Sequence, residues 1–355
     1  MEEALLYLLR VSGYLVVERD DSDPTLKHNR SGLKVIGRGG LHQIDAIADF
    51  AVAQPFSYPQ RLLVEAKCYS DTRRVGIDII RKAIGVLKDV GEYWVTQDKD
   101  GSSISTMMVG KPRYHYQYAL FSASGYTSEA EKYAYAHDIY LIPLAGSRYI
   151  QPIITAIRHL DSRSFGAQSR DAININMTQL RRAIREGIRN PRHPGLTRAV
   201  GNQELAFRLL DEFCRLCHQM NGAALAMIEK RFPLFLVPSP DLNIAELRDV
   251  YKVSIHWDIE GRWYLRSVFK DRILFSFDLP RDLFELYAEE GVLSPKRALD
   301  LKAEYLSSIQ ATIMLDGRIR IITFQLDREW LVQIRERLSQ MPRRLDQGGM
   351  TLADG

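Results

Sequence analysis

RLLVEAKCYS, at residues 61–70, is the stretch that decides the fold of the first part of the chain. Its apolar run Leu62–Val64 is typical of a buried strand, yet Glu65 and Lys67 place opposite charges at alternate positions. Because successive side chains of a strand point to opposite faces, these two charges share one face. Charges are seldom buried without a partner, a metal ion or a reaction that uses them.

The composition is that of an ordinary globular protein. The 355 residues are 46% hydrophobic and 26% charged, which is enough for two domains. Apolar runs fall short of the roughly 18 to 20 residues of a membrane helix, and the acidic start MEEALLYLLRVSGY is unlike a signal peptide, so we expect no membrane contact and a cytoplasmic location. Three cysteines are too few for a disulfide framework, and the net charge of +4 mildly favours an anionic partner.

Apolar periodicity predicts an α/β domain over residues 1–150. A helical pattern comes first, followed by strand patterns, a helix, a strand, a helix and a closing strand. In order, these segments are 3–10, 14–18, 33–40, 41–50, 61–69, 75–94, 118–126, 128–138 and 139–144.

The rest of the chain has a different texture. Residues 151–230 are predicted to be a helical segment, and 231–340 an α+β domain in which strands alternate with helices. A weak internal echo, with Phe277 and Arg281 spaced as Phe324 and Arg328 are, raises the alternative of two related strand-helix repeats. Residues 341–355 have the composition of a flexible tail.

A third charge joins the opening pair. If 41–50 is a strand, Leu41, Gln43 and Asp45 share one face, and Asp45 lies in an apolar run as Glu65 does. Two carboxylates on adjacent strands could hold a divalent metal such as Mg²⁺, with Lys67 beside it to polarise water or neutralise phosphate. The alternative is a buried ion pair without a chemical role, although such pairs are often no more stable than apolar replacements.

Residues 44–48, IDAIA, followed by LLVEAKCY at 62–69 after a glycine-rich turn, resemble the catalytic core of the PD-(D/E)xK nuclease superfamily, in particular its Mrr-like branch associated with type IV restriction endonucleases. The likeness extends to GVLKDV at 85–90 and to FSASGYTSEAEKYAYAHDIYLIPL at 121–144. It implies a restriction-endonuclease-like mixed central sheet flanked by helices over about residues 1–147, ahead of the helical segment and the α+β domain.

By this resemblance Asp45 and Glu65 would be metal ligands for Mg²⁺ or Mn²⁺, joined by the backbone carbonyl of Ala66. Lys67 would be the catalytic lysine, and Gln43 would contact metal-bound water or phosphate. The resemblance also implies an auxiliary acid on the first helix, for which Glu3 is the candidate although Glu2 adjoins it. Ile44 stands where the superfamily name has a proline, a departure common in the Mrr-like branch.

A basic segment follows the predicted nuclease domain. Residues 181–198 contain six arginines and one acidic residue, either as a solvated helix face or as a surface that holds DNA phosphates without reading sequence. The predicted contacts are Arg181, Arg182, Arg185 and Arg189. CRLCH at 214–218 matches a haem-attachment pattern, but its helical apolar setting favours core cysteines.

The predicted function is therefore metal-dependent hydrolysis of DNA phosphodiester bonds by an endonuclease, with a role in prokaryotic defence against foreign DNA implied by the resemblance. Cutting both strands favours a homodimer or higher oligomer. The alternative is a nucleic-acid-binding or sensor protein that uses a nuclease-like fold for recognition, with the C-terminal domain binding a ligand or a defence-system partner. A structural assembly protein is a third reading, favoured only by the repeat-like C-terminal half.

Overall fold

The computed structural model describes residues 1–18, 22–29, 32–52, 55–91, 113–144, 147, 149–160, 176–191, 195–200, 203–229, 232–258, 261–289, 291–340 and 350–351. The chain forms two compact units. The first comprises Met1–Arg10 and Tyr14–Gln219, and the second comprises Val11–Gly13 and Met220–Gly355. None of the described helices is long and apolar enough to cross a membrane.

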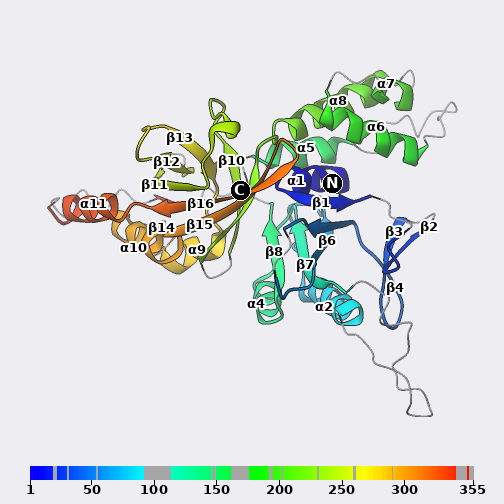
Figure 1. The fold of residues 1–355 in the computed structure, drawn as a ribbon, viewed down its shortest axis with the longest axis horizontal. Helices are drawn as coiled ribbons and strands as arrows, with labels where there is room; N and C mark the ends of the chain where they lie inside the picture. The colour runs from blue at the N-terminus through cyan, green and yellow to red at the C-terminus, as the bar shows by residue number, and fades with distance from the viewer. Residues whose placement is uncertain are drawn as a thin grey trace, which may run out of the picture. The chain divides into compact units, whose positions relative to one another are not determined.

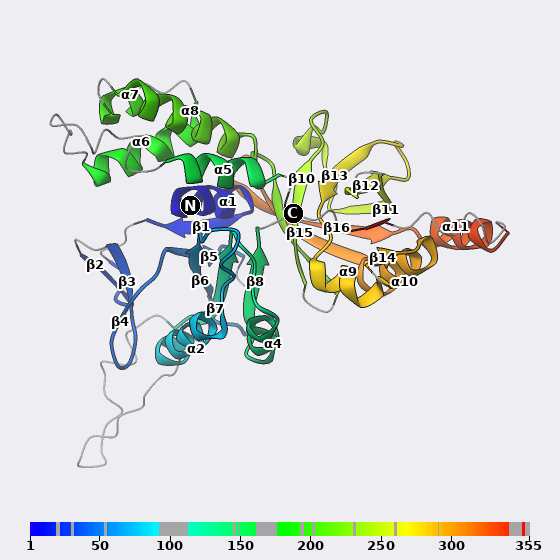
Figure 2. The same ribbon diagram turned by 180° about the vertical axis from the view of Figure 1, so that it is seen from behind.

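The first unit is built on a mixed sheet in the order β1-β5-β6-β7-β8 (Figures 1 and 2). Strand β6 pairs antiparallel with β5 and parallel with β7, while β1–β5 is antiparallel and β7–β8 parallel. The α/β class predicted for this region is confirmed. The strands are β1 (Tyr14–Val17), β5 (Ala46–Phe50), β6 (Gln60–Lys67), β7 (His115–Ser122) and β8 (Ile139–Pro143).

Helices cover both faces of this sheet. Helices α2 and α4 lie on one side and α1 and α5 on the other, as both ribbon views show. Local signals fix their ends: α1 has two glutamates in its first turn and an arginine in its last, which suits the helix dipole, and the Thr127 side chain caps α4. The helices are α1 (Glu2–Val11), α2 (Ile77–Gly91), α4 (Ser128–Ala136), α5 (Gln151–His159), α6 (Met177–Arg189), α7 (Gly195–Val200) and α8 (Glu204–His218).

A small antiparallel sheet, β2 (Leu26–Asn29), β3 (Gly32–Ile36) and β4 (Leu41–Gln43), stands beside the main one. The turn between β3 and β4 is held by Asp89 of α2, which accepts a hydrogen bond from Gly39 N at 2.8 Å and pairs with His42 Nε2 at 2.7 Å. A Cβ at Gly37 would lie 2.0 Å from the Asp89 carboxylate, so this close approach requires glycine. His42 therefore has a structural role, since its ring nitrogen is engaged by Asp89.

The second unit is a closed seven-stranded barrel in the order β10-β13-β12-β11-β16-β15-β9. Its strands are β9 (Ala224–Ile228), β10 (Pro233–Pro238), β11 (Val250–Trp257), β12 (Trp263–Ser267), β13 (Ile273–Phe277), β15 (Ser308–Leu315) and β16 (Arg318–Leu326). A two-stranded sheet and helices accompany it: β14 (Val292–Leu293), β17 (Met350–Thr351), η2 (Ile244–Glu246), α9 (Arg281–Tyr287), α10 (Pro295–Tyr305) and α11 (Arg328–Gln340).

The units divide differently from the predicted segments. Helices α5 to α8 belong to the first unit, and the main segment of the second unit begins at Met220, so that β9 precedes the predicted start at 231. The predicted echo does match a strand pair followed by a helix in both places, since α9 begins at Arg281 and α11 at Arg328. Most of the predicted tail lies outside the described residues. Cys214 and Cys217 are buried in α8, as expected of core cysteines.

Lys302 of α10 is a buried cation in the second unit. Its side chain is 3% exposed, and its Nζ lies 4.2 Å from the ring centroid of Trp257 and 5.4 Å from those of Trp263 and Trp330. Burial lowers the pKa of Lys302 to about 7, while the three rings attract its charged form. No carboxylate pairs with it in the part of the chain that the structure describes.

We expect Lys302→Met to stabilise the barrel by on the order of a few kcal/mol at pH 6, because burying the ammonium costs more than the rings return. The folded-state pKa is lowered, so the unfolded chain binds a proton that the folded chain lacks between about pH 7 and 10.5. The advantage of methionine should therefore be full below pH 7 and shrink as the pH rises toward 10. Thermal unfolding followed by tryptophan fluorescence measures it. A variant less stable than wild type at pH 6 would show that the cation–π contacts dominate.

Candidate active site

Asp45 lies where β5 separates from β6. The last residue pair between these strands is Ala46↔Val64, and extending the register by one residue sets Asp45 opposite Glu65. Asp45 occupies a bend, and its Oδ2 accepts a hydrogen bond from Ala66 N at 2.8 Å. The Asp45 carboxylate thus accepts the hydrogen bond that a backbone carbonyl of a neighbouring strand would otherwise accept from Ala66 N. This bond holds Asp45 at the carboxyl end of β6.

The predicted single strand over 41–50 is wrong. Strand β4 ends at Gln43 and pairs with β3 in the small sheet, while β5 begins at Ala46 in the main sheet. The bend at Asp45 changes the side-chain alternation, since Ile44 and Ile47 both reach the same apolar core. Gln43 is exposed, two residues before Asp45 and directly opposite Lys34. Its predicted place on a common strand face with Asp45 therefore does not hold.

Glu65 and Lys67 lie on one face of β6, as predicted, and form an ion pair. Tyr118 of β7 is fully buried, and its hydroxyl donates a hydrogen bond to the second carboxylate oxygen of Glu65. The Glu65 and Lys67 side chains keep 25% and 21% of their surface exposed. Glu65 is thus held from two sides while solvent, and anything dissolved in it, can still reach the pair.

The charges at this position perturb one another. Burial, followed by the negative charge of Glu65, raises the pKa of Asp45, although the Ala66 N–H and the positive charges of Lys67 and Arg181 oppose this. Burial alone would lower the pKa of Lys67, but its hydrogen bond with Glu65 and the nearby carboxylates raise it. Asp45 and Glu65 are thus close enough that the charge of one opposes ionisation of the other. A cation bound between two such carboxylates would be stabilised.

Arg61, at the other end of β6, shows what a purely structural ion pair in this strand looks like. It is 2% exposed and donates to Asp49 at 2.7 Å and to Thr25 at 2.8 Å, with Asp23 2.8 Å away. The ring of Tyr114 lies against its guanidinium, 3.6 Å from centroid to Cζ. Glu65 and Lys67 differ from this closed network because they are partly exposed and lie beside a second carboxylate whose pKa is raised.

Of the two adjoining glutamates of the first helix, Glu2 is the one whose charge interacts with that of Asp45, whereas Glu3, the predicted auxiliary acid, is held by Arg185. Burial raises the pKa of Glu2, and the negative charge of Asp45 contributes, which places Glu2 near the site. Glu3 is instead 8% exposed and accepts hydrogen bonds from Nε and Nη2 of Arg185, at 2.6 and 3.1 Å. Adjacent residues of a helix point about 100° apart, so only one of the two can face Asp45.

The arginines of α6 are engaged within the first unit. Arg181 pairs with Glu2 at 2.8 Å, Arg185 with Glu3 and Glu18, and Arg189 with Glu18 at 3.4 Å. Arg182 pairs along its own helix with Glu186 at 3.0 Å. Three of the four predicted DNA contacts thus bind carboxylates of the chain's first 18 residues, a role that the sequence analysis did not predict.

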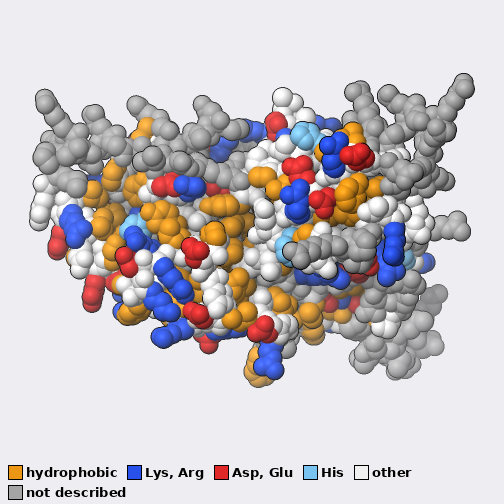
Figure 3. Space-filling model, turned by 90° about the horizontal axis from the view of Figure 1, so that it is seen from above, with side chains coloured by type: hydrophobic (Ala, Val, Ile, Leu, Met, Phe, Trp, Pro, Cys, Tyr) orange, Lys and Arg blue, Asp and Glu red, His pale blue; other side chains and the backbone are white. Residues whose placement is uncertain are grey.

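On the face drawn in Figure 3, basic and acidic side chains are interspersed. Arg181 has a second connection, because its charge also acts on Asp45. Helix α6 therefore reaches the candidate site through Arg181 and Glu2. DNA binding by the four arginines remains a prediction, and the more exposed Arg182 and Arg189 are the ones with most room for it.

Asp45, Glu65 and Ala66 suit a hard divalent cation. The N–H and C=O of a strand residue point to the same edge, so the Ala66 carbonyl faces the edge where its N–H meets Asp45. In the described ranges, no group of three or more His, Cys, Asp and Glu side chains is arranged to hold a metal. A metal here would rely on two carboxylates, one carbonyl and water, a donor set that suits Mg²⁺ because it retains several waters.

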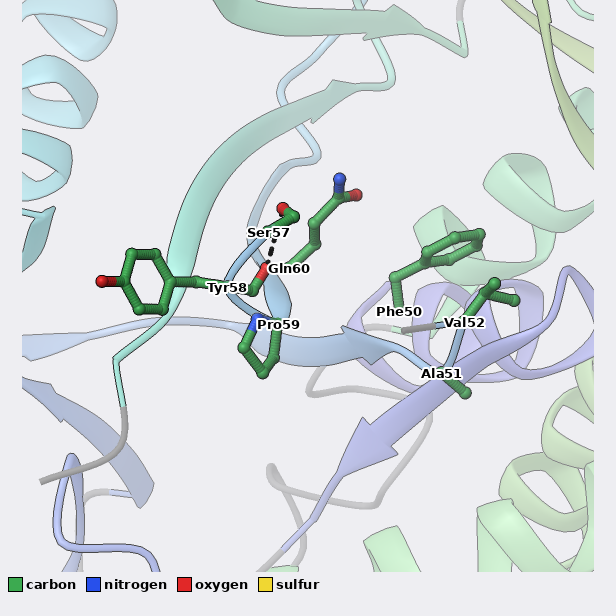
Figure 4. Close-up of a pocket in the computed structure, with 7 residues that line it drawn as sticks. All are labelled: Phe50, Ala51, Val52, Ser57, Tyr58, Pro59 and Gln60. Carbon is green, nitrogen blue, oxygen red and sulfur yellow. Dashed lines mark hydrogen bonds between the residues drawn. The ribbon is translucent and has the colours of Figure 1, made fainter. Parts of the chain in front are cut away.

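A hollow of about 210 Å³ lies elsewhere on the first unit (Figure 4). It is lined by residues of the β5–β6 connection, from Phe50–Val52 and Ser57–Gln60. Tyr58 is the sole titratable residue in this lining, and Gln60 stands at the opposite end of β6 from Lys67. The lining of this hollow contains no acidic or basic side chain, in contrast to the charges gathered at the carboxyl end of β6.

Tyr118 is absent from the sequence-based prediction, which names Glu2 only as the neighbour of Glu3 and Arg181 only as a DNA contact. For Tyr118 a signal existed, since a tyrosine inside an apolar strand normally finds a hydrogen-bond partner. For Arg181 no local pattern could reveal the partner, because Glu2 lies 179 residues away in sequence.

Comparisons with known proteins give little more. No family model and no curated protein matches the chain. A solved structure titled "Crystal Structure of Protein of Unknown Function AF1548" is similar at 15% identity, covering 61% of this chain and 98% of that one with a TM-score of 0.32. A likeness this distant carries no weight for fold or function.

Proposed function

We propose that this chain is a metal-dependent endonuclease that hydrolyses DNA phosphodiester bonds. The observation that supports it most is the meeting of Asp45, Glu65 and Lys67 at the end of β6, through the bend before β5 and the hydrogen bond from Ala66 N. The mixed order β1-β5-β6-β7-β8 with helices on both faces is compatible with the restriction-endonuclease-like arrangement that the sequence resemblance implies.

Each residue has a defined part in this proposal. Asp45, Glu65 and the Ala66 carbonyl would hold Mg²⁺ or Mn²⁺, which when bound activates water and offsets phosphate charge. Tyr118 keeps the Glu65 carboxylate in place by its hydrogen bond. Lys67 carries a positive charge beside both carboxylates and would stabilise negative charge on the attacked phosphate. The charge of Glu2 interacts with that of Asp45, but among the described residues Glu2 does not complete a group of three carboxylates arranged to hold a metal.

The biological setting is also a proposal. The resemblance to Mrr-like nucleases points to defence against foreign DNA in the cytoplasm. A double-strand cut would need two such sites, so we propose a dimer or higher oligomer. The barrel of the second unit would then be the part that receives a ligand or a defence-system partner.

We expect Lys67→Ala to lower the rate of cleavage about a hundredfold, the usual loss for a group that stabilises transition-state charge. Affinity for the metal should fall little, because removing Lys67 frees an oxygen of Glu65. Single-turnover cleavage of a short DNA duplex over a range of Mg²⁺ concentrations separates the two effects.

Lys132→Ala is a suitable control, since Lys132 is exposed on α4. It should cut at the wild-type rate. If Lys67→Ala cuts as fast as this control and is only less stable to heat, the Glu65–Lys67 pair is structural. If wild type binds DNA and never cuts it, the recognition or sensor function is favoured instead.

A further inference from the structure

The small sheet β2–β4 carries a row of side chains that its own stability does not explain. Lys27 of β2 lies directly opposite Lys34 of β3, and Lys34 lies directly opposite Gln43 of β4. Directly paired residues of antiparallel strands project from the same face, with Cβ atoms about 5 Å apart. The three residues therefore form a line across the sheet, which we call the lysine row.

The opposite face of this sheet is accounted for by packing. Leu26 and Val35 are paired there and belong to the apolar core under the main sheet, and His42 beside them binds Asp89. The lysine row thus faces outward, with Lys27 exposed and Lys34 partly so.

Two like charges directly opposite each other destabilise a sheet by about 0.2 to 1 kcal/mol. Neither lysine has a hydrogen bond or ion pair with any described residue. Lysine on an edge strand is a common guard against aggregation, but β3 is the central strand, so this reason does not apply to Lys34. The α6 arginines differ in that each has a carboxylate partner.

We propose that the lysine row is the surface that holds the phosphate backbone of duplex DNA at the candidate active site. Neither ammonium group has a partner among the described residues, so an anion between them would remove their repulsion, and a polyanion would be complementary in charge. The row also ends at Gln43, two residues from Asp45, so a strand gripped there passes close to the end of β6. This inference rests on the proposed function, because it assigns the grip on the same substrate.

The test is binding of a fluorescein-labelled 20-base-pair DNA duplex by the full chain in EDTA, where the proposed hydrolysis stops. Lys27→Gln/Lys34→Gln should weaken binding roughly tenfold at 0.1 M salt and reduce the slope of log affinity against log salt by about two units. The matched control is Lys82→Gln/Lys132→Gln, which removes two exposed charges from α2 and α4. It should bind as wild type does.

The unfolding temperature of the lysine-row variant should be unchanged or slightly higher than that of wild type, because the repulsion between the two lysines is lost. Equal affinity and slope for this variant and wild type would overturn the inference, and so would an equal loss in the control. If either of these results were found while wild type cleaved DNA normally, the proposed hydrolysis would stand, and only the assignment of DNA binding to the lysine row would be wrong. A wild type that binds no duplex, or prefers RNA of equal length through the same lysines, would overturn DNA as the partner.

Discussion

Asp45→Asn is expected to lower the rate of Mg²⁺-dependent DNA cleavage by at least about a thousandfold, since it removes a carboxylate ligand for the metal that activates water. The amide oxygen of asparagine can still accept the hydrogen bond that Ala66 N gives to Asp45. The fold and the affinity for DNA in EDTA should therefore survive. Cleavage of a labelled duplex under single-turnover conditions measures the loss.

Stability separates this outcome from misfolding. The pKa of Asp45 is raised in the folded chain, so its ionisation opposes folding and the opposing effect grows as the pH rises through that pKa. Without metal at pH 7, Asp45→Asn should unfold at the wild-type temperature or higher. Added Mg²⁺ should raise the unfolding temperature of wild type but not that of Asp45→Asn. Asp78→Asn, at an exposed position of α2, is the control. A variant that cuts like this control would contradict the site.

Arg61→Met is expected to destabilise the first unit by about 3 to 5 kcal/mol, the usual result of removing one partner from a buried ion pair. Asp23 would be left buried without its cation, and Asp49 would lose two hydrogen bonds. Chemical unfolding followed by circular dichroism gives the change. Arg81→Met, which removes an exposed ion pair, should cost less than about 1 kcal/mol.

The dependence on pH has a definite sign. Burial would raise the pKa of Asp23, but its hydrogen bonds from Thr25 and Arg61 lower it below 3.8. Ionised Asp23 therefore stabilises the folded chain above pH 3.8, and this stabilisation is lost as the pH falls below that value. The difference in free energy of unfolding between wild type and Arg61→Met should therefore become smaller at acid pH. Adding Asp23→Asn to Arg61→Met should recover part of the loss. An Arg61→Met protein as stable as wild type at pH 7 would contradict the closed network.

The core of the candidate site could be predicted because it depends on local rules. Period-two alternation alone puts Glu65 and Lys67 on one face, and the spacing of the strands brings Asp45 beside them. The bend at Asp45 was not predictable, because it arises from a change of pairing partner: β4 joins β3, and β5 joins β6.

Other features depend on contacts between distant segments. The partners of Glu2 and Glu3 depend on where α6 packs, since Arg181 binds Glu2 and Arg185 binds Glu3. A run of arginines looks the same in sequence whether it faces solvent, DNA or a carboxylate. The barrel is a similar case, because closure requires β9 to pair with both β10 and β15, and an alternating pattern predicts strands without specifying their neighbours.

The most direct measurement is incubation of supercoiled plasmid with the purified full chain in Mg²⁺, beside Glu65→Gln prepared in the same way. We expect nicked and linear DNA with wild type, no product in EDTA, renewed cleavage when Mg²⁺ is restored, and no product from Glu65→Gln. Intact plasmid with wild type in Mg²⁺ and in Mn²⁺, or equal cutting by Glu65→Gln, would contradict a metal-dependent nuclease site at the end of β6.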